Sequence, residues 1–334
     1  MNTITLGSLT FYPFGICIAV SALLGLFIAI ARAGDEKEKN ALSLFAVLAF
    51  PLGFLFSRLG YCLCLLDWIS DDFIGNFLAF TDGGFLYYGT LAGCLLALFI
   101  TCRAEHVSFG MLADRLALPA AVTTALCCAG AVLAGQGYGW GITDWFTEDE
   151  GMSLFVLEDS SFFTRFPFAL TDYYGTARWA VCFLEAVVIL LFALFPLRRE
   201  KASGSGSAAS LFLMLYASAE VLIESMRQDD VLRWGFVRIN QVLSVALLVI
   251  LVIILWKRYG LKASVPVRSL VGILAGVILC GLMEFALEKK ISLIEWMPMD
   301  VCYLISAIGC AIMFLSADRT RRAAYCAEKE LITP

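Results

Sequence analysis

The stretch LFLMLYASAEVLIESMRQDD, residues 211–230, places two carboxylates and a cation on one side of an otherwise apolar segment. Glu220 and Glu224 are one helical turn apart and Arg227 follows one turn later, so in a helix all three share one face. Like carboxylates at this spacing repel each other, so at least one should carry a proton or pair with Arg227 or Arg58. Charged groups at membrane depth are costly and commonly mark function, so the stretch predicts a membrane helix that carries a functional site.

The whole chain has the composition of a membrane protein. Of its 334 residues 60% are hydrophobic and 16% are charged, and the mean hydropathy is +0.84, which excludes an ordinary soluble domain. Because apolar runs of roughly 20 residues recur, we expect an all-α polytopic membrane protein. The run from Phe14 to Ala31 is too long for a signal-peptide core and no basic region precedes it, so we expect it to remain as the first span. The nine predicted spans are residues 12–31, 42–66, 84–102, 111–135, 177–197, 209–226, 238–257, 267–286 and 298–317.

The charged residues predict an orientation, because most of the 24 Lys and Arg residues fall into one of the two alternating sets of loops. By the positive-inside rule this set is cytoplasmic, which predicts a multi-pass protein of the bacterial cytoplasmic (inner) membrane with its N-terminus outside and its C-terminus inside. The long outer segment 136–176, with the acidic cluster Glu148, Asp149 and Glu150, is expected to be a subdomain or an interfacial cap. The Gly- and Ser-rich segment 201–210 is expected to be an inner linker.

The cysteines predict packing rather than metal binding. Most of the 12 lie inside apolar runs, where a free thiol packs as a small hydrophobic group. Cys62 and Cys64 are too close together for a Cys-x-x-Cys motif, and His106 is the one histidine of the chain. We therefore expect no metal site and no cofactor.

Several polar groups are expected in the outer half of the membrane. The Gly-rich segments DGGFLYYGTLAG (82–93) and AGQGYGWG (134–141) should lie near the same face. Together they predict an outward-facing cavity for a lipid-like substrate, with structural hydrogen bonds between closely packed helices as the alternative. The polar residues are Glu220, Glu224, Arg227, Asn240 and Gln241.

Eight segments, taken in order, carry a family pattern. They are LTFYPFGICIAVSALLG (9–25), SRLGYCL (57–63), GGFLYYGTLAG (83–93), ADRLALP (113–119), CAGAVLAGQGYG (128–139), RWAVCFLEA (178–186), YASAEVLIESMRQDD (216–230) and NQVLS (240–244). In order and spacing the chain resembles the bacterial prolipoprotein diacylglyceryl transferases from its N-terminus to about Gly260. The resemblance implies seven family spans in a domain of residues 1–260, and two extra spans with a basic tail in residues 261–334.

The chain departs from the family pattern at charged positions. Tyr88 stands where the family has a histidine, and Cys128 and Glu220 stand where it has arginines. Replacing a cation by a carboxylate beside a phosphodiester turns attraction into repulsion. Arg58, Glu224 and other residues keep the family identity.

The resemblance implies transfer of a diacylglyceryl group from phosphatidylglycerol to the thiol of a lipobox cysteine in a prolipoprotein signal peptide. A catalytically inactive relative that binds lipid or lipopeptide in the bilayer is the main alternative, and ion or proton transport is a third. No nucleic-acid partner is expected. The candidate catalytic residues are Tyr88, Glu220 and Glu224, and the candidate substrate-binding residues are Arg58, Gly89, Gln136, Arg178, Arg227 and Gln241.

Overall fold

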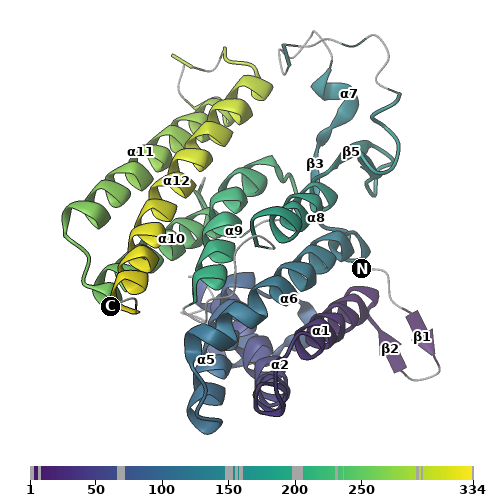
Figure 1. Cartoon of the computed structure of the whole chain (residues 1–334). Helices are drawn as coiled ribbons and strands as arrows, with labels where there is room; N and C mark the ends of the chain where they lie inside the picture. Colours follow the sequence, from purple (N-terminus) through teal and green to yellow (C-terminus); the bar gives the residue numbers. More distant parts are fainter. Residues whose placement is uncertain are drawn as a thin grey trace. The chain divides into compact units, whose positions relative to one another are not determined.

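The long helices of the computed structural model follow the predicted spans (Figure 1). Among the described residues, eight helices are long and apolar enough to cross a membrane, which confirms an all-α polytopic membrane protein. They are α1 (Pro13–Ala31), α2 (Glu36–Cys64), α5 (Tyr87–Ala104), α6 (Phe109–Gly130), α9 (Ser207–Met226), α10 (Ile239–Tyr259), α11 (Ser264–Leu287) and α12 (Met299–Ile332). The structure describes residues 4–6, 9–65, 72–146, 153–154, 157, 161–197, 206–229, 232–235, 237–290, 293–294 and 296–332.

The segment predicted as the fifth span, residues 177–197, differs from the others. Its first four residues form strand β5 (Ala177–Ala180), and the α-helix α8 covers only Val181–Phe192. A π-helical turn, η4 (Ala193–Leu197), extends it. At about 1.5 Å per residue, α8 alone is shorter than the roughly 30 Å hydrocarbon core. The predicted orientation stays a prediction, and it requires residues 181–197 to cross as a ninth span.

Short elements connect the long helices. Strand β3 (Tyr138–Gly141) and β4 (Ala169–Thr171) flank β5 in an antiparallel sheet of order β3-β5-β4, in which Leu170 pairs with Arg178. The remaining short elements are β1 (Ile4–Leu6), β2 (Leu9–Phe11), α4 (Phe73–Leu78), η1 (Phe80–Asp82), η2 (Ala131–Ala134), α7 (Ile142–Trp145), β6 (Arg233–Trp234) and β7 (Val237–Arg238).

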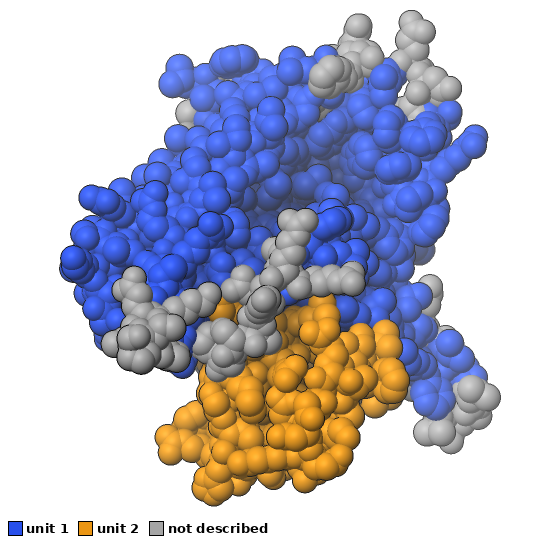
Figure 2. All heavy atoms as spheres, in the orientation of Figure 1, with its two compact units in different colours: residues 1–21, 121–199, 210–334 blue, residues 22–120, 200–209 orange. Residues whose placement is uncertain are grey.

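The chain divides into two compact units, coloured separately in Figure 2. Unit 2, residues 22–120 and 200–209, is built on the contact between α2 and α5. Gly89 and Gly93 of α5 lie against the backbone of α2, where a Cβ would overlap the carbonyl groups of Phe56 and Leu52. Small residues thus allow the two helix backbones to approach closely.

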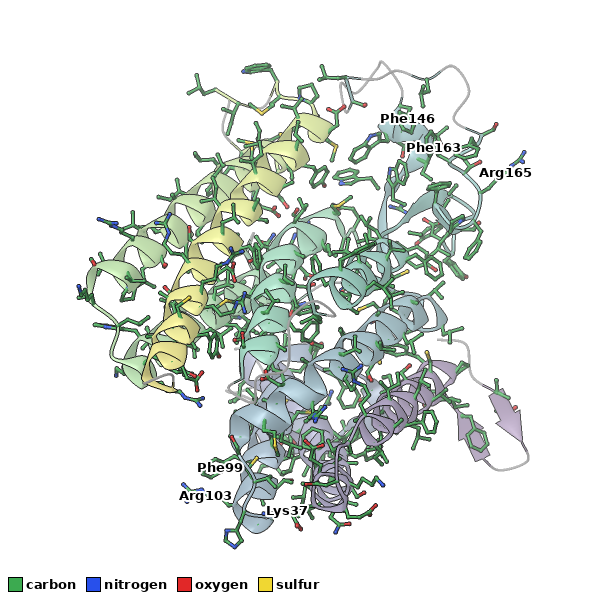
Figure 3. All side chains as sticks on the ribbon, viewed as in Figure 1. Lys37, Phe99, Arg103, Phe146, Phe163 and Arg165 are labelled. Atoms are coloured by element: carbon green, nitrogen blue, oxygen red, sulfur yellow. The ribbon has the colours of Figure 1, made fainter. Side chains whose placement is uncertain are left out.

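Polar and cationic side chains also shape unit 2. The buried Asp114 carboxylate accepts hydrogen bonds from the backbone N–H groups of Gly206, Ala208 and Ala209, which caps the first turn of α9. Near the C-terminal end of α5, the Arg103 guanidinium lies over the Phe99 ring at 5.2 Å. Near the N-terminal end of α2, Lys37 donates to the His106 carbonyl (Figure 3).

Unit 1, residues 1–21, 121–199 and 210–334, contains the largest apolar core. Buried Met214, Leu248, Ile273 and Met313 meet there, one each from α9, α10, α11 and α12. Helices α11 and α12 lie side by side (Figure 1). The predicted basic tail is part of α12, which continues to Ile332. The predicted domain boundary after residue 260 therefore falls inside unit 1 and stays a prediction.

The long outer segment carries an aromatic cluster in unit 1. The rings of Phe146 and Phe163 are 5.6 Å apart and point toward each other, whereas Arg165 points away from the ribbon (Figure 3). Trp179 of β5 contacts both phenylalanines. The acidic cluster Glu148, Asp149 and Glu150 and residues 201–205 of the predicted linker lie outside the described residues.

Candidate functional site

The C-terminal end of α9 holds the charged stripe that the sequence predicts. The Glu220 side chain is 5% exposed and Glu224 is fully buried. Arg227 lies one turn beyond Glu224, and its Nη1 atom is 3.6 Å from Glu224 Oε2. The structure therefore pairs Glu224 with Arg227, one of the two partners expected from the helix spacing.

Asp229 is a member of this cluster that the sequence prediction missed. Arg227 donates from Nε to Asp229 Oδ1 at 3.0 Å and from Nη2 to Asp229 Oδ2 at 2.7 Å, a bidentate ion pair. The Gly137 N–H donates to the same carboxylate at 2.7 Å, and Gly137 has φ 83°, which a residue with a side chain rarely adopts. An acidic residue two positions after a buried arginine was the signal available in the sequence.

This pairing sets the ionisation of Asp229. Burial alone would raise the pKa of the Asp229 carboxyl. The hydrogen bonds and charge of Arg227, together with the Gly137 N–H, outweigh burial and bring the pKa below its ordinary value. Asp229 is therefore an anion at neutral pH, and the Arg227 guanidinium lies between two acids.

A second chain of polar side chains begins at Glu220. Glu220 is hydrogen-bonded to Tyr216 of the same helix and to Glu185 of α8. Glu185 is in turn hydrogen-bonded to the thiol of Cys128, near the end of α6. The side chains of Tyr216, Glu220, Glu185 and Cys128 therefore form a continuous series that places two carboxyl groups next to each other in a buried site.

Arg238 fixes the end of α9 from the start of α10. Its side chain is 2% exposed, and its Nη1 donates to the carbonyls of Glu224 and Arg227 at 2.5 and 2.7 Å. Its Nε donates to Glu284 of α11 at 3.0 Å. Gln241 donates to the Val221 carbonyl at 3.0 Å and is also hydrogen-bonded to Glu284. Helices α10 and α11 thus support the cluster.

Two other predicted site residues of unit 1 lie on the strand-rich segment. Gln136 is exposed, and its backbone N–H donates to the Ala131 carbonyl at 3.1 Å. Arg178 of β5 donates to Asp172 at 2.5 Å. The hydrogen bond from Arg178 lowers the pKa of the Asp172 carboxyl, and the backbone N–H groups of Thr176 and Tyr174 add to this effect. Arg178 therefore belongs to a local ion pair of the sheet.

Arg58, Tyr88 and Gly89 belong to unit 2. The Arg58 side chain is 1% exposed, and its guanidinium donates to the carbonyls of a single segment. It thus holds residues 76–84 against α2, with Ser57 Oγ donating to the Leu86 carbonyl at 2.9 Å beside it. Tyr88 forms an edge-to-face contact with Tyr87 at 5.7 Å. The carbonyls that accept from Arg58 are those of Asn76, Phe77, Ala79, Gly83 and Gly84.

Within unit 1 the structure therefore brings together Glu220, Glu224, Arg227 and Gln241, and adds Asp229, Glu185, Cys128, Arg238 and Glu284. Their convergence with the unit 2 residues on one cavity stays a prediction. Among the described residues, no group of three or more His, Cys, Asp or Glu side chains is arranged to hold a metal ion. What the unit 1 cluster supplies chemically is a buried pair of carboxyl groups together with a guanidinium.

Comparison with known proteins gives a consistent result. The family model described as prolipoprotein diacylglyceryl transferase matches residues 2–257. A phosphatidylglycerol–prolipoprotein diacylglyceryl transferase of Listeria welshimeri serovar 6b is 28% identical over 265 residues, which cover 79% of this chain and 91% of that protein. A protein of the same name from Halalkalibacterium halodurans is 25% identical over 255 residues, covering 76% and 84%. The family match ends at residue 257, so α11 and α12 lie beyond the matched residues.

Proposed function

This chain belongs to the prolipoprotein diacylglyceryl transferase family, and on that premise we propose that it transfers a diacylglyceryl group from phosphatidylglycerol to a cysteine thiol of a prolipoprotein. The observation that carries the proposal is the family match over residues 2–257, which includes every candidate site residue named from the sequence. A multi-pass helical protein suits this reaction because the donor is a membrane lipid.

The chemistry defines what the site must supply. A bond forms between the thiol sulfur and the glycerol carbon of the diacylglyceryl group, and the bond from that carbon to the phosphate oxygen breaks. The phosphoglycerol leaves with the electron pair, and the thiol proton passes to a base. The site therefore needs an acceptor for one proton and cations for the charge that develops on the phosphate.

We assign the proton acceptor to Glu220. It stands where the family has an arginine, it is buried, and it lies next to the Glu185 carboxyl group. A carboxyl pair that already holds one proton can accept a second without leaving two adjacent negative charges in a low dielectric. Glu224 lies between Glu220 and Arg227 on the same helix face, one turn from each, and pairs with Arg227.

We assign the phosphate-handling role to Arg227, with Arg58 and Arg178 as further headgroup contacts. Arg227 keeps its Nη1 group opposite Glu224 at 3.6 Å while Nε and Nη2 are held by Asp229. A guanidinium oriented in this way presents its remaining N–H groups in a fixed direction. Tyr88, Gly89, Gln136 and Gln241 are proposed to position the two substrates. The proposed location is the inner membrane, with the N-terminus outside.

A lipidation assay tests the proposal. The purified chain is mixed with phosphatidylglycerol and a lipobox peptide, and the peptide mass is followed. We expect a gain of one diacylglyceryl unit that is absent for a Cys→Ser peptide. Glu220→Gln should lower kcat at least about 100-fold, the usual contribution of a general base. The matched control is Glu36→Gln, an exposed acid at the start of α2, which should leave kcat unchanged. Lipid binding without any gain in peptide mass would refute the proposal and favour a non-catalytic relative.

A further inference from the structure

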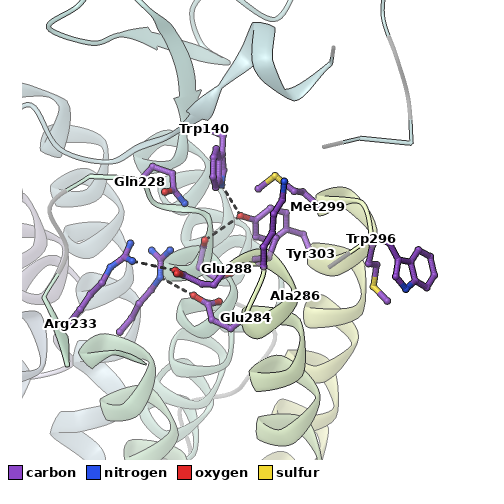
Figure 4. Close-up of a pocket in the computed structure, with 14 residues that line it drawn as sticks. Trp140, Gln228, Arg233, Glu284, Ala286, Glu288, Trp296, Met299 and Tyr303 are labelled. Atoms are coloured by element: carbon purple, nitrogen blue, oxygen red, sulfur yellow. Dashed lines mark hydrogen bonds and ion pairs between the residues drawn. The ribbon is translucent and has the colours of Figure 1, made fainter. Parts of the chain in front are cut away.

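A cavity of about 590 Å³ opens at the ends of three long helices of unit 1, α9, α11 and α12 (Figure 4). Its walls come from the C-terminal ends of α9 and α11, the β6–β7 hairpin before α10, and the N-terminal end of α12. Its volume is in the usual range for small-molecule sites. The residues that line it include Trp140, Gln228, Arg233, Glu288, Lys289 and Tyr303.

The cavity lies where lipid headgroups are found. Each of the three helices that line it has the length and hydropathy of a membrane span, so their ends lie at the boundary between hydrocarbon and water. Trp140 and Tyr303 form its aromatic wall, with Trp140 Nε1 donating to the Tyr303 hydroxyl at 3.2 Å and that hydroxyl donating to the Ser225 carbonyl at 3.2 Å. Aromatic side chains with a polar tip are typical of this boundary.

The charged lining favours an anion. Arg233, Arg238 and Lys289 supply three cations, whereas Glu284 and Glu288 supply two carboxylates. Arg238 is committed to Glu284 and to two backbone carbonyls. Among the described residues, Arg233 has one ion-pair partner, Glu288 at 3.4 Å, and its side chain is 30% exposed. The lining therefore has one excess positive charge, and Arg233 is the cation that a ligand can recruit.

Two further donors line the same cavity. Within the described part of the chain, the Lys289 ammonium forms no ion pair, and the Gln228 amide forms no side-chain hydrogen bond. The Glu288 carboxylate is shared between Arg233 and Lys290, at 3.4 and 3.7 Å, and can accept from a hydroxyl group. Cationic donors beside a carboxylate acceptor match a phosphate ester that carries neighbouring hydroxyl groups.

We infer that this cavity is a binding site for a phosphorylated polyol, with Arg233 and Lys289 on the phosphate and Glu288 on a hydroxyl. The ligand chemistry is shared by a soluble glycerol phosphate and by the headgroup of phosphatidylglycerol. Lys289, Glu288 and Tyr303 follow the residues that match the family model, so the site uses elements added to the family domain. The inference does not depend on the proposed transfer reaction.

The test measures binding without any acceptor peptide, so failure of the transferase proposal leaves its result unaffected. Isothermal titration calorimetry of the full chain in nonionic detergent uses glycerol 1-phosphate as the probe and glycerol as the uncharged control. We expect saturable binding of glycerol 1-phosphate and a dissociation constant for glycerol at least tenfold weaker. Arg233→Gln and Lys289→Gln should each weaken glycerol 1-phosphate binding roughly tenfold, because each removes a charge-assisted hydrogen bond.

A matched control is Arg268→Gln, which removes the same charge from an exposed position near the other end of α11 and should leave binding unchanged. Competition with short-chain phosphatidylglycerol identifies which kind of ligand the site takes. Displacement of glycerol 1-phosphate supports a lipid headgroup, and no displacement supports a soluble phosphate ester. Equal binding of glycerol and glycerol 1-phosphate, or equal effects of Arg268→Gln and Lys289→Gln, would overturn the inference. Lys289 is exposed, so its substitution tests the site even if Arg233→Gln does not fold.

Discussion

Arg238 and Glu284 form a buried ion pair, with Nε and Oε1 3.0 Å apart, that joins the start of α10 to α11. Arg238 is also the residue that holds the carbonyls of Glu224 and Arg227. Helix α11 follows the family-matched residues, whereas α9 and the candidate site lie within them. One side-chain pair thus connects the added C-terminal helices to the backbone that carries the site.

Removing one partner of this pair should destabilise the protein strongly. Glu284→Ala leaves the Arg238 guanidinium buried with an unbalanced charge, and we expect a loss of about 3 kcal/mol in the free energy of unfolding. Thermal unfolding in detergent measures the loss. The double variant Arg238→Met with Glu284→Met should lose less than the sum of the two single variants.

The control for this prediction is Glu36→Ala, which removes the partner of Lys39 in an ion pair whose side chains are 81% and 43% exposed. A surface pair of this kind contributes at most about 1 kcal/mol. Equal losses for Glu284→Ala and Glu36→Ala would mean that the Arg238 contacts do not support α9.

Asp229 should make stability depend on pH. The pKa of Asp229 is lower in the folded state than the ordinary value of about 3.9. Its ionised form therefore stabilises the fold fully above that value, and this stabilisation is lost as the pH falls through the folded-state pKa. The unfolding temperature should therefore decline below about pH 4. Asp229→Asn should be less stable at pH 7, and its decline at low pH should be smaller. An unchanged slope in Asp229→Asn would contradict the role of this pair.

Gly89 should be intolerant of any side chain. A Cβ atom there would overlap the Phe56 carbonyl and lie 2.8 Å from Ser57 Cα, both backbone atoms of α2. Gly89→Ala is expected to cost about 1–3 kcal/mol. Gly281 is also helical, but a Cβ atom there meets no other atom within 4 Å, so Gly281→Ala should be neutral or stabilising by up to about 1 kcal/mol. Comparable losses of stability in both variants would show that the close contact with α2 is not what requires glycine at position 89.

Arg58 should be needed for stability even without a ligand. Its planar guanidinium reaches five carbonyl groups, whereas the single ammonium of lysine cannot reproduce that geometry. Arg58→Lys should lower the unfolding temperature of the ligand-free protein and increase proteolysis within residues 76–84. Arg103→Lys, at an exposed position near the C-terminal end of α5, is the control and should have little effect. If Arg58→Lys affected lipid binding alone, its main role would be in substrate contact.

The spans were predictable because burying apolar surface in a bilayer depends on local composition, which can be read from a window of the chain. The exception is residues 177–197, where hydropathy predicted a span but Ala177–Ala180 pair with β3 and β4. Strand pairing depends on a partner distant in the sequence, so a hydropathy window does not detect it.

The charged face of α9 followed from helical periodicity alone, because Glu220, Glu224 and Arg227 recur once per turn. Their partners did not follow from it. Asp229 reaches Arg227 around the end of the helix, Glu185 reaches Glu220 from α8, and Glu284 reaches Arg238 from α11. Which acid holds a proton and which is an anion depends on these contacts across helices, because ionisation in a low dielectric depends on the nearest charges and donors in space rather than along the chain.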